Sequence, residues 1–188
     1  MLTPSTKFTA LRKKIEAEPN ATKWIVFCQF HDEMDMLMDY LNKSNSIGVI
    51  QMYHGGMTDK EKEDVLDKTL EPNEYGCHEI LLLQLQSGGV GLNLQHFSKI
   101  VFMSPWWTSA LMDQAIGRAV RIGQKDKVEV IMLILKEEET LNIDSMMLEK
   151  ADDKRGQLQM LFSHASKGLS QDQQLEDQEL EDQVEEVK

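Results

Sequence analysis

Residues 78–94, HEILLLQLQSGGVGLNL, join an apolar segment to a loop that holds three glycines. The first eight residues are rich in leucine and isoleucine and predict a strand buried on both faces. Gly88, Gly89 and Gly91 follow directly, and glycines after a buried strand permit positive φ angles and let backbone amides approach a phosphate closely. The loop matches neither G-x-x-x-x-G-K-[ST] nor G-x-G-x-x-G, so a tight turn without a ligand explains these residues equally well.

Apolar, strand-like segments alternate with amphipathic ones outward from this stretch. We predict strands at 23–30, 47–53, 78–85, 98–103 and 128–135, and helices at 7–18, 31–43, 58–70, 109–122 and 137–166. Strands joined through helices of this length predict right-handed crossovers and a mostly parallel sheet covered on both faces. The expected fold class is therefore α/β, a three-layer domain whose functional loops gather at the carboxyl ends of the strands.

Helical spacing also predicts which side chains face the core. In the third helix we expect Val65, Leu66 and Leu70 to point inward, behind a Thr58 N-cap. The closing helix has an apolar face made of Leu141, Ile143, Met147, Leu148 and Ala151, which should be ordered up to about residue 163.

The net charge of −12 is unevenly distributed. Residues 171–188 hold eight acidic residues and one lysine, so this segment has a net charge of −7. The rest of the chain has a net charge of −5. Such a segment has too little apolar surface to offset its ordering entropy, so we expect a folded domain over 1–163 and an acidic, disordered tail over 164–188. A negative domain disfavours a broad nucleic-acid-binding surface but allows a local groove of backbone amides and a few cations.

Other features of the whole chain argue against a membrane protein, a secreted protein and a metal-binding protein. No apolar run approaches the roughly 18–20 residues that span a bilayer, and the N-terminus lacks the order of a secretory signal, so we expect an intracellular protein without a membrane span. Cys28, Cys77, His54 and His78 have no partners at metal-ligand spacing, so we expect buried free thiols and no metal.

The helix predicted at 109–122 carries two arginines. Gln114, Arg118 and Arg121 are spaced i, i+4 and i+7, which places them on one face. The opposite face is apolar and holds Met112, Ile116 and Ala119. Two arginines on a helix most often belong to an ordinary solvated face. Only the glycine loop that precedes this helix favours a functional face.

Five segments together carry a specific resemblance. They are WIVFCQF at 24–30, MYHGGMT at 52–58, LLLQLQSGGVGLNL at 81–94, VFMSPWW at 101–107 and QAIGRAVRIGQ at 114–124. In order and spacing they resemble the characteristic segments of the second, C-terminal RecA-like lobe of Swi/Snf-family DNA translocases, within helicase superfamily two. The resemblance extends over about residues 5–155, and the last two segments are highly specific.

The resemblance implies roles for individual residues. ATP with Mg²⁺ lies between two lobes in that family, and Arg118 and Arg121 match arginine fingers that stabilise charge on the transferred γ-phosphoryl group. Nucleotide contacts are implied for Gln114, Gly91 and Asn93. Contacts with double-stranded DNA are implied for loop residues, namely Gln29, Tyr53, His54, Gly55, Ser87, Gly88, Gly89 and Trp107. For Trp107 and its neighbour Trp106, core packing at a strand end is an equal alternative.

Six positions depart from the family pattern. Gly117 and Val120 stand where members usually have Asp and His, and Ser104 stands where Asp is common. Thr108 and Ser109 stand where Asn-Pro is common, and Gln86 stands where Thr or a basic residue is common. These changes remove polar and basic partners from the DNA-facing loops, while both arginines are retained.

The sequence contains neither a Walker lysine loop nor an Asp-Glu-x-His segment, both of which belong to the first lobe. We therefore predict the second lobe of an ATP-dependent DNA translocase of the chromatin-remodelling type, which needs a first lobe from its own or another chain and does not hydrolyse ATP alone. The family implies a nuclear location. The alternative is a detached, non-catalytic interaction module, and an ordinary nucleotide-binding α/β enzyme is a weaker third possibility.

Overall fold

The computed structural model describes residues 5–72, 76–87, 92–121, 124, 126–135 and 143–152. Within them lie the strands of one sheet, which are β1 (Lys23–Cys28), β2 (Ile47–Tyr53), β3 (His78–Gln84), β4 (Lys99–Phe102) and β5 (Glu129–Met132). Their order is β2-β3-β1-β4-β5, and every neighbouring pair is parallel. All five strands therefore end at the same edge of the sheet, and the predicted α/β class is confirmed.

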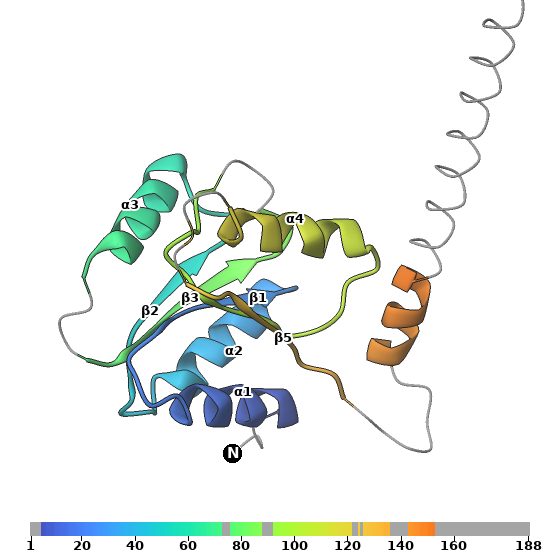
Figure 1. The fold of residues 1–188 in the computed structure, drawn as a ribbon, viewed down its shortest axis with the longest axis horizontal. Coiled ribbons are helices and arrows are strands. Elements are labelled where there is room, and N and C mark those ends of the chain that lie inside the picture. The colour runs from blue at the N-terminus through green and yellow to red at the C-terminus, as the bar shows by residue number, and fades with distance from the viewer. Residues whose placement is uncertain are drawn as a thin grey trace, which may run out of the picture.

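Helices cover both faces of this sheet (Figure 1). Helices α1 (Thr6–Glu16) and α2 (His31–Leu41) cover one face, and α3 (Asp59–Leu70) and α4 (Ser109–Ala119) cover the other. Alternate residues of β1 serve the two layers, because Trp24 and Val26 pack with α1 and α2 while Ile25 and Phe27 belong to the opposite cluster. This is the three-layer arrangement that the alternating sequence predicts.

Helix α3 differs from its prediction at its last turn. Thr58 is the N-cap as predicted, and its hydroxyl and the Glu61 side chain form a capping box. Leu70, however, is 62% exposed, so its predicted inward orientation is wrong. Thr69 is buried instead, because it lies one turn after Val65 and its hydroxyl donates to the Leu66 carbonyl at 2.6 Å. Because Thr69 is four residues after Val65, the two side chains lie on the same buried face of α3.

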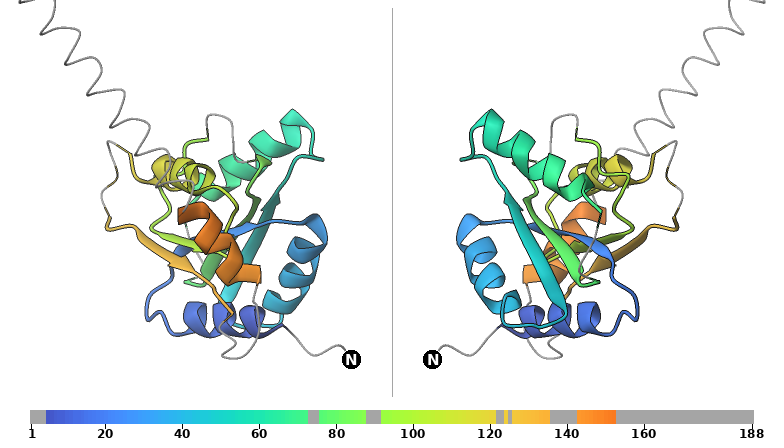
Figure 2. Two further views of the ribbon diagram at one scale, coloured as in Figure 1. Left: turned by 90° about the vertical axis from the view of Figure 1, so that its right-hand side faces the viewer. Right: turned by 90° about the vertical axis from the view of Figure 1, so that its left-hand side faces the viewer.

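The closing helix is described over residues 143–152, and it lies beyond β5 at the side of the sheet opposite β2 (Figures 1 and 2). Met147 and Ala151 are buried as predicted, but Ile143 is 66% exposed. Asp144 takes the inward position, so the buried stripe runs through 144, 147 and 151. Leu141, the boundary predicted at 163 and the acidic tail lie outside the described residues.

Asp144 is buried because Lys7 reaches it. The Lys7 ammonium lies 2.6 Å from Asp144 Oδ2 and donates to Ser104 Oγ at 2.7 Å. The same Asp144 oxygen accepts from the Leu135 amide at 2.9 Å. We call Lys7, Ser104 and Asp144 the Lys7 cluster, and it ties α1, the end of β4 and the closing helix together.

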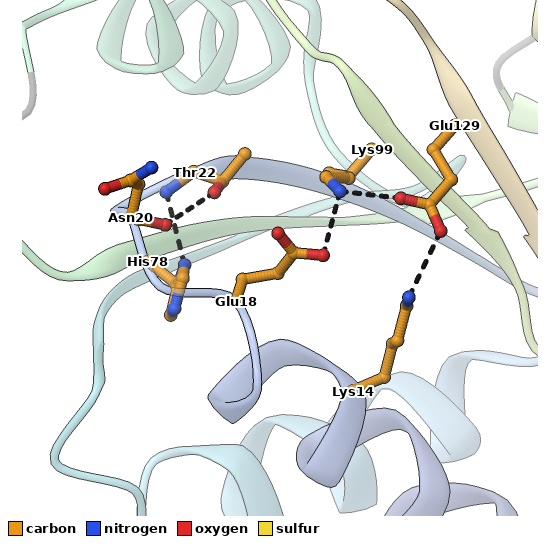
Figure 3. A network of polar contacts seen from close by, with 7 residues as sticks. All are labelled: Lys14, Glu18, Asn20, Thr22, His78, Lys99 and Glu129. Carbon is orange, nitrogen blue, oxygen red and sulfur yellow. Dashed lines mark hydrogen bonds and ion pairs between the residues drawn. The ribbon is translucent and has the colours of Figure 1, made fainter.

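A second polar network holds the amino edge of the sheet (Figure 3). Lys99 Nζ lies 2.8 Å from Glu18 Oε1 and 2.6 Å from Glu129 Oε2, and Lys14 reaches the other Glu129 oxygen at 3.1 Å. Partial burial alone would lower the pKa of Lys99, but its hydrogen bonds to Glu129 and Glu18 more than offset this and raise the pKa. The network fixes the starts of β4 and β5 on the side away from the strand ends.

His96 gives the fold a predictable pH dependence. Its Nε2 lies 2.8 Å from Thr69 Oγ1, and burial, together with the charge of Lys23, lowers the pKa of His96 from 6.5 to about 4. The unfolded chain therefore binds a proton more readily, so this contribution to stability is complete above pH 6.5 and is lost as pH falls towards 4.

We expect His96→Gln to flatten the pH dependence of the free energy of unfolding between pH 6.5 and 4, measured by urea titration. His31→Gln, which removes an exposed histidine, is the control. An unchanged slope in the His96 variant would contradict the assignment.

Candidate nucleotide and DNA interface

The segments that follow β1, β2, β3 and β4 are joined by hydrogen bonds where the strands end. Beyond β1, β3 and β4, the ladder continues by one residue, because the Leu85 amide donates to the Cys28 carbonyl and the Met103 amide to the Phe27 carbonyl, each at 3.0 Å. The Gln29 side chain then donates to the Pro105 carbonyl at 3.0 Å. Gln29 and the segment that leads to Trp107 are thereby linked, as the sequence predicts for residues of one site.

Gln84, the last residue of β3, joins two further predicted site residues. Its Oε1 accepts from the Gly55 amide at 3.2 Å and from the Ser87 hydroxyl at 2.9 Å. A Cβ at Gly55 would lie 3.1 Å from Ser87 Oγ, so the two loops approach each other as closely as glycine allows. Sequence reasoning missed Gln84, although a polar residue at the end of an otherwise apolar strand was a usable signal.

The loop glycines cannot be placed with them, because Gly88, Gly89 and Gly91 lie outside the described residues. Asn93, just after the loop, accepts from the Gln95 amide at 3.3 Å through its side chain and is exposed. The next residue, Leu94, donates its amide to the Arg118 carbonyl at 3.3 Å. The chain that leaves the glycine loop therefore runs against the end of α4.

Arg118 lies beside Tyr53 at the end of β2. Tyr53 is 6% exposed, and burial together with the Asp59 charge raises its pKa, while the nearby positive charge of Arg118 opposes the rise. Lys62 Nζ lies 6.0 Å from the centre of the Tyr53 ring. The Nε atom of Arg118 is buried, so part of its guanidinium lies against the protein itself.

Arg121 is placed differently from the prediction. Helix α4 ends at Ala119, and Val120, its C-cap, has ψ of 85°, so Arg121 is not on the helix. The shared face of Gln114, Arg118 and Arg121 is therefore wrong for Arg121, which is exposed and whose carbonyl accepts from the Gln124 amide at 3.0 Å. Gln114 is on the helix and exposed. The opposite face is apolar as predicted, with Met112 and Ala119 buried and Ile116 partly buried.

The two tryptophans have separate surroundings. Trp106 is partly buried and packs against the core cluster on the α3 and α4 side, whereas Trp107 is 42% exposed. Core packing therefore accounts for Trp106 only, and Trp107 is available at the surface. Among the cysteines, Cys28 is buried as predicted and burial raises the pKa of its thiol, while Cys77 is only partly buried.

Gly117 and Gly55 differ in the space available for a Cβ atom, so alanine substitutions at these two positions form a matched pair of variants. A Cβ at Gly117 meets nothing within 4 Å, so Gly117→Ala should stabilise the chain by about 0.5–1 kcal/mol, as expected for glycine in a helix. Gly55→Ala should instead displace the Ser87 hydroxyl, because the added Cβ would lie 3.1 Å from Ser87 Oγ. The DNA contact that the family resemblance implies for Gly55 further predicts weaker binding of double-stranded DNA. Urea unfolding and DNA titration of both variants test this, and equal DNA affinities would contradict that implied contact.

A parallel RecA-like sheet with arginine, glycine and amide groups gathered at its carboxyl edge defines a helicase-type lobe. Residues 6–123 match the family model described as the helicase conserved C-terminal domain. The chain therefore belongs to this family.

Curated relatives agree with this assignment. The chain is 34% identical over 155 residues to DNA repair protein RAD5 of Candida albicans, which covers 80% of this chain and 14% of the relative. It is 35% identical over 156 residues to RAD5 of Saccharomyces cerevisiae, covering 80% and 13%, and 35% identical over 133 residues to RAD5A of Arabidopsis thaliana, covering 70% and 12%. The chain thus spans about one seventh of the length of these relatives.

The fold is also found in a solved structure. The crystal structure of the C-terminal part of the Fun30 ATPase domain superposes with a TM-score of 0.67 at 23% identity, covering 78% of this chain and 45% of that one. At this identity the likeness concerns the fold. Within the residues that the structure describes, no helix is long and apolar enough to cross a membrane.

Proposed function

We propose that this chain acts as the second lobe of an ATP-dependent double-stranded DNA translocase. The observation that carries the proposal is the strand-end edge, where Gln29 donates to the Pro105 carbonyl, Gln84 joins Gly55 to Ser87, and the charge of Arg118 acts on Tyr53. A permanently charged guanidinium at a strand-end edge is suited to bind phosphate oxygens in a bidentate manner.

The residues at this edge fit part of a nucleotide site. Arg118 supplies a positive charge and Asn93 an exposed side-chain amide, whereas the sequence offers no Walker lysine loop for the β- and γ-phosphates. In phosphoryl transfer, Mg²⁺ neutralises charge on the phosphate oxygens, and that ion belongs with the first lobe. In this proposal Arg118 and Arg121 stabilise the transferred group from this side of the cleft, and Gln114 and Gly91 contact the nucleotide.

DNA is proposed to lie along the loops that follow β1, β2 and β3. In this proposal Gly55, Ser87, Gly88 and Gly89 approach the phosphates of one strand, and Gln84 holds the Gly55 amide and the Ser87 hydroxyl in position. Tyr53, His54 and Gln29 complete the same side, and the exposed Trp107 lies towards the duplex. Contacts of this kind hold DNA without reading its sequence, which suits a translocase.

A chimera tests the whole proposal. This chain replaces the matching 155-residue segment of the Candida albicans RAD5 protein, so that a first lobe is present, and DNA-stimulated ATP hydrolysis is measured. We expect stimulation by double-stranded DNA in the chimera and no hydrolysis by the isolated chain. Hydrolysis by the isolated chain would favour an ordinary nucleotide-binding enzyme, and a folded but inactive chimera would favour the non-catalytic interaction module.

The names of the relatives suggest a setting. Because they are DNA repair proteins, we propose that the parent protein acts on chromosomal DNA and is located in the nucleus. A fluorescent fusion of the parent protein should coincide with stained DNA, and exclusion from it would contradict this part of the proposal.

A further inference from the structure

Two histidines from different loops meet at the strand-end edge. His31 is the first residue of α2, and His54 directly follows β2. Their Nε2 atoms lie 3.2 Å apart, and their rings are nearly perpendicular, with centroids 4.3 Å apart. The sequence analysis gave His54 no partner, because the fold alone brings residues 23 positions apart together.

The orientation of His31 decides which of its nitrogens can act as a ligand. Its Nδ1 lies 3.1 Å from Asp35 Oδ2, one helical turn later, and donates its proton to that carboxylate. With the proton on Nδ1, the lone pair is on Nε2, which points at His54. A carboxylate that orients a histidine in this way is the usual support of a metal-binding imidazole.

The separation of the two nitrogens suits a shared ion. Zinc binds imidazole nitrogen at about 2.0–2.1 Å with tetrahedral angles, which places two such nitrogens about 3.3 Å apart. We propose that His31 and His54 bind a divalent transition-metal ion of the Zn²⁺ class, each through Nε2, with water completing the coordination.

The surroundings favour a cation at this point. Burial, with the charge of His31, lowers the pKa of His54. Asp35 and Glu61 add negative charge near His54, and Lys62 is the opposing positive charge. The His31 side chain is 47% exposed, so an ion and its water ligands reach the site from solvent.

Metal binding has two local costs. The ion replaces the hydrogen bond between the two Nε2 atoms. His54 Nδ1 now accepts from the Gly56 amide at 3.2 Å, and because a metal on Nε2 requires that Nδ1 carry the proton, this second hydrogen bond is also released. Gly56 is exposed, so water replaces the lost acceptor, and the ion ties the start of α2 to the end of β2 in exchange. This inference concerns the isolated chain and does not depend on the proposed translocase function.

Titration of the full chain tests the site. Co²⁺ binding is followed by visible absorption, and Zn²⁺ affinity by competition with Co²⁺. We expect His31→Asn and His54→Asn to abolish the absorption change, and Asp35→Asn to weaken binding by about 10–100-fold, as for other carboxylates that support a metal-bound histidine. Circular dichroism verifies that each variant is folded.

Two controls separate this site from its neighbours. Asp32→Asn addresses the exposed group of His31, Asp32 and Asp35, whose ligand atoms lie within 4.8 Å of one another, and Cys77→Ser addresses the partly buried thiol. Both should leave the affinity unchanged. Equal affinity in folded His54→Asn, or loss of binding in Asp32→Asn or Cys77→Ser, overturns the proposal.

Discussion

Arg118→Ala is expected to lower DNA-stimulated ATP hydrolysis by the two-lobe chimera by about 10³–10⁵-fold, the range measured when an arginine finger is lost. Its charge acts on Tyr53, the last residue of β2. Lys62, whose Nζ lies 6.0 Å from the centre of the Tyr53 ring, carries an ammonium group and lacks the bidentate geometry of a guanidinium.

Three further variants make this result specific. Arg118→Lys keeps the charge but loses bidentate geometry, so it should recover only part of the rate. Arg121→Ala should lower turnover without a change in melting temperature, because Arg121 is exposed and lies outside α4. Arg12→Ala, which removes an exposed arginine paired with Glu16 on α1, should leave the rate unchanged. A folded Arg118→Ala chimera with hydrolysis within twofold of the parent would rule out the finger.

Asp144→Ala is expected to destabilise the chain by about 3–5 kcal/mol, the usual result of removing one partner of a buried ion pair. The Lys7 and Asp144 side chains are 11% and 8% exposed. Without Asp144, the Lys7 ammonium keeps only the Ser104 hydroxyl, and the Leu135 amide loses its acceptor. Urea unfolding of the purified variant measures the change.

The control for this prediction is Asp152→Asn, an exposed acid on the same closing helix, which should change stability by less than about 0.5 kcal/mol. The double variant Lys7→Met with Asp144→Leu should recover much of the loss, because apolar side chains can replace a buried pair without leaving a charge behind. A loss below about 1 kcal/mol in Asp144→Ala would show that the Lys7 cluster is not a stabilising contact.

Periodicity and strand alternation predicted the fold well, for a physical reason. Residues such as Phe8, Leu11 and Ile15 repeat at helical spacing and are buried, and each predicted strand contains an observed one. Burial of apolar side chains largely determines where these helices and strands form, and the spacing of apolar residues is visible in the sequence. The errors lie at Leu70 and Ile143, in the first or last turn of a helix, where a polar neighbour with a distant partner takes the inward position.

The candidate site was only partly predictable. The motifs named the loops, but the contacts that join them pass through Gln84, which lies inside one segment without an implied role, and through His31, which lies outside all five. The burial of Asp144 could not be predicted from the sequence either, since a charged residue is buried only when a partner such as Lys7 lies opposite it in space. Helical spacing also extended α4 too far, because no helix-ending signal separates Ala119 from Arg121 in the sequence.

The buried Nε of Arg118 has a consequence for how two lobes would meet. Folding of this lobe alone already strips water from one edge of the guanidinium. A neighbour that closes over the remaining edge has less hydration left to displace, and it meets a side chain whose rotamer is already restricted. In the proposed two-lobe assembly, closure on this side therefore costs less desolvation than it would for a fully hydrated arginine.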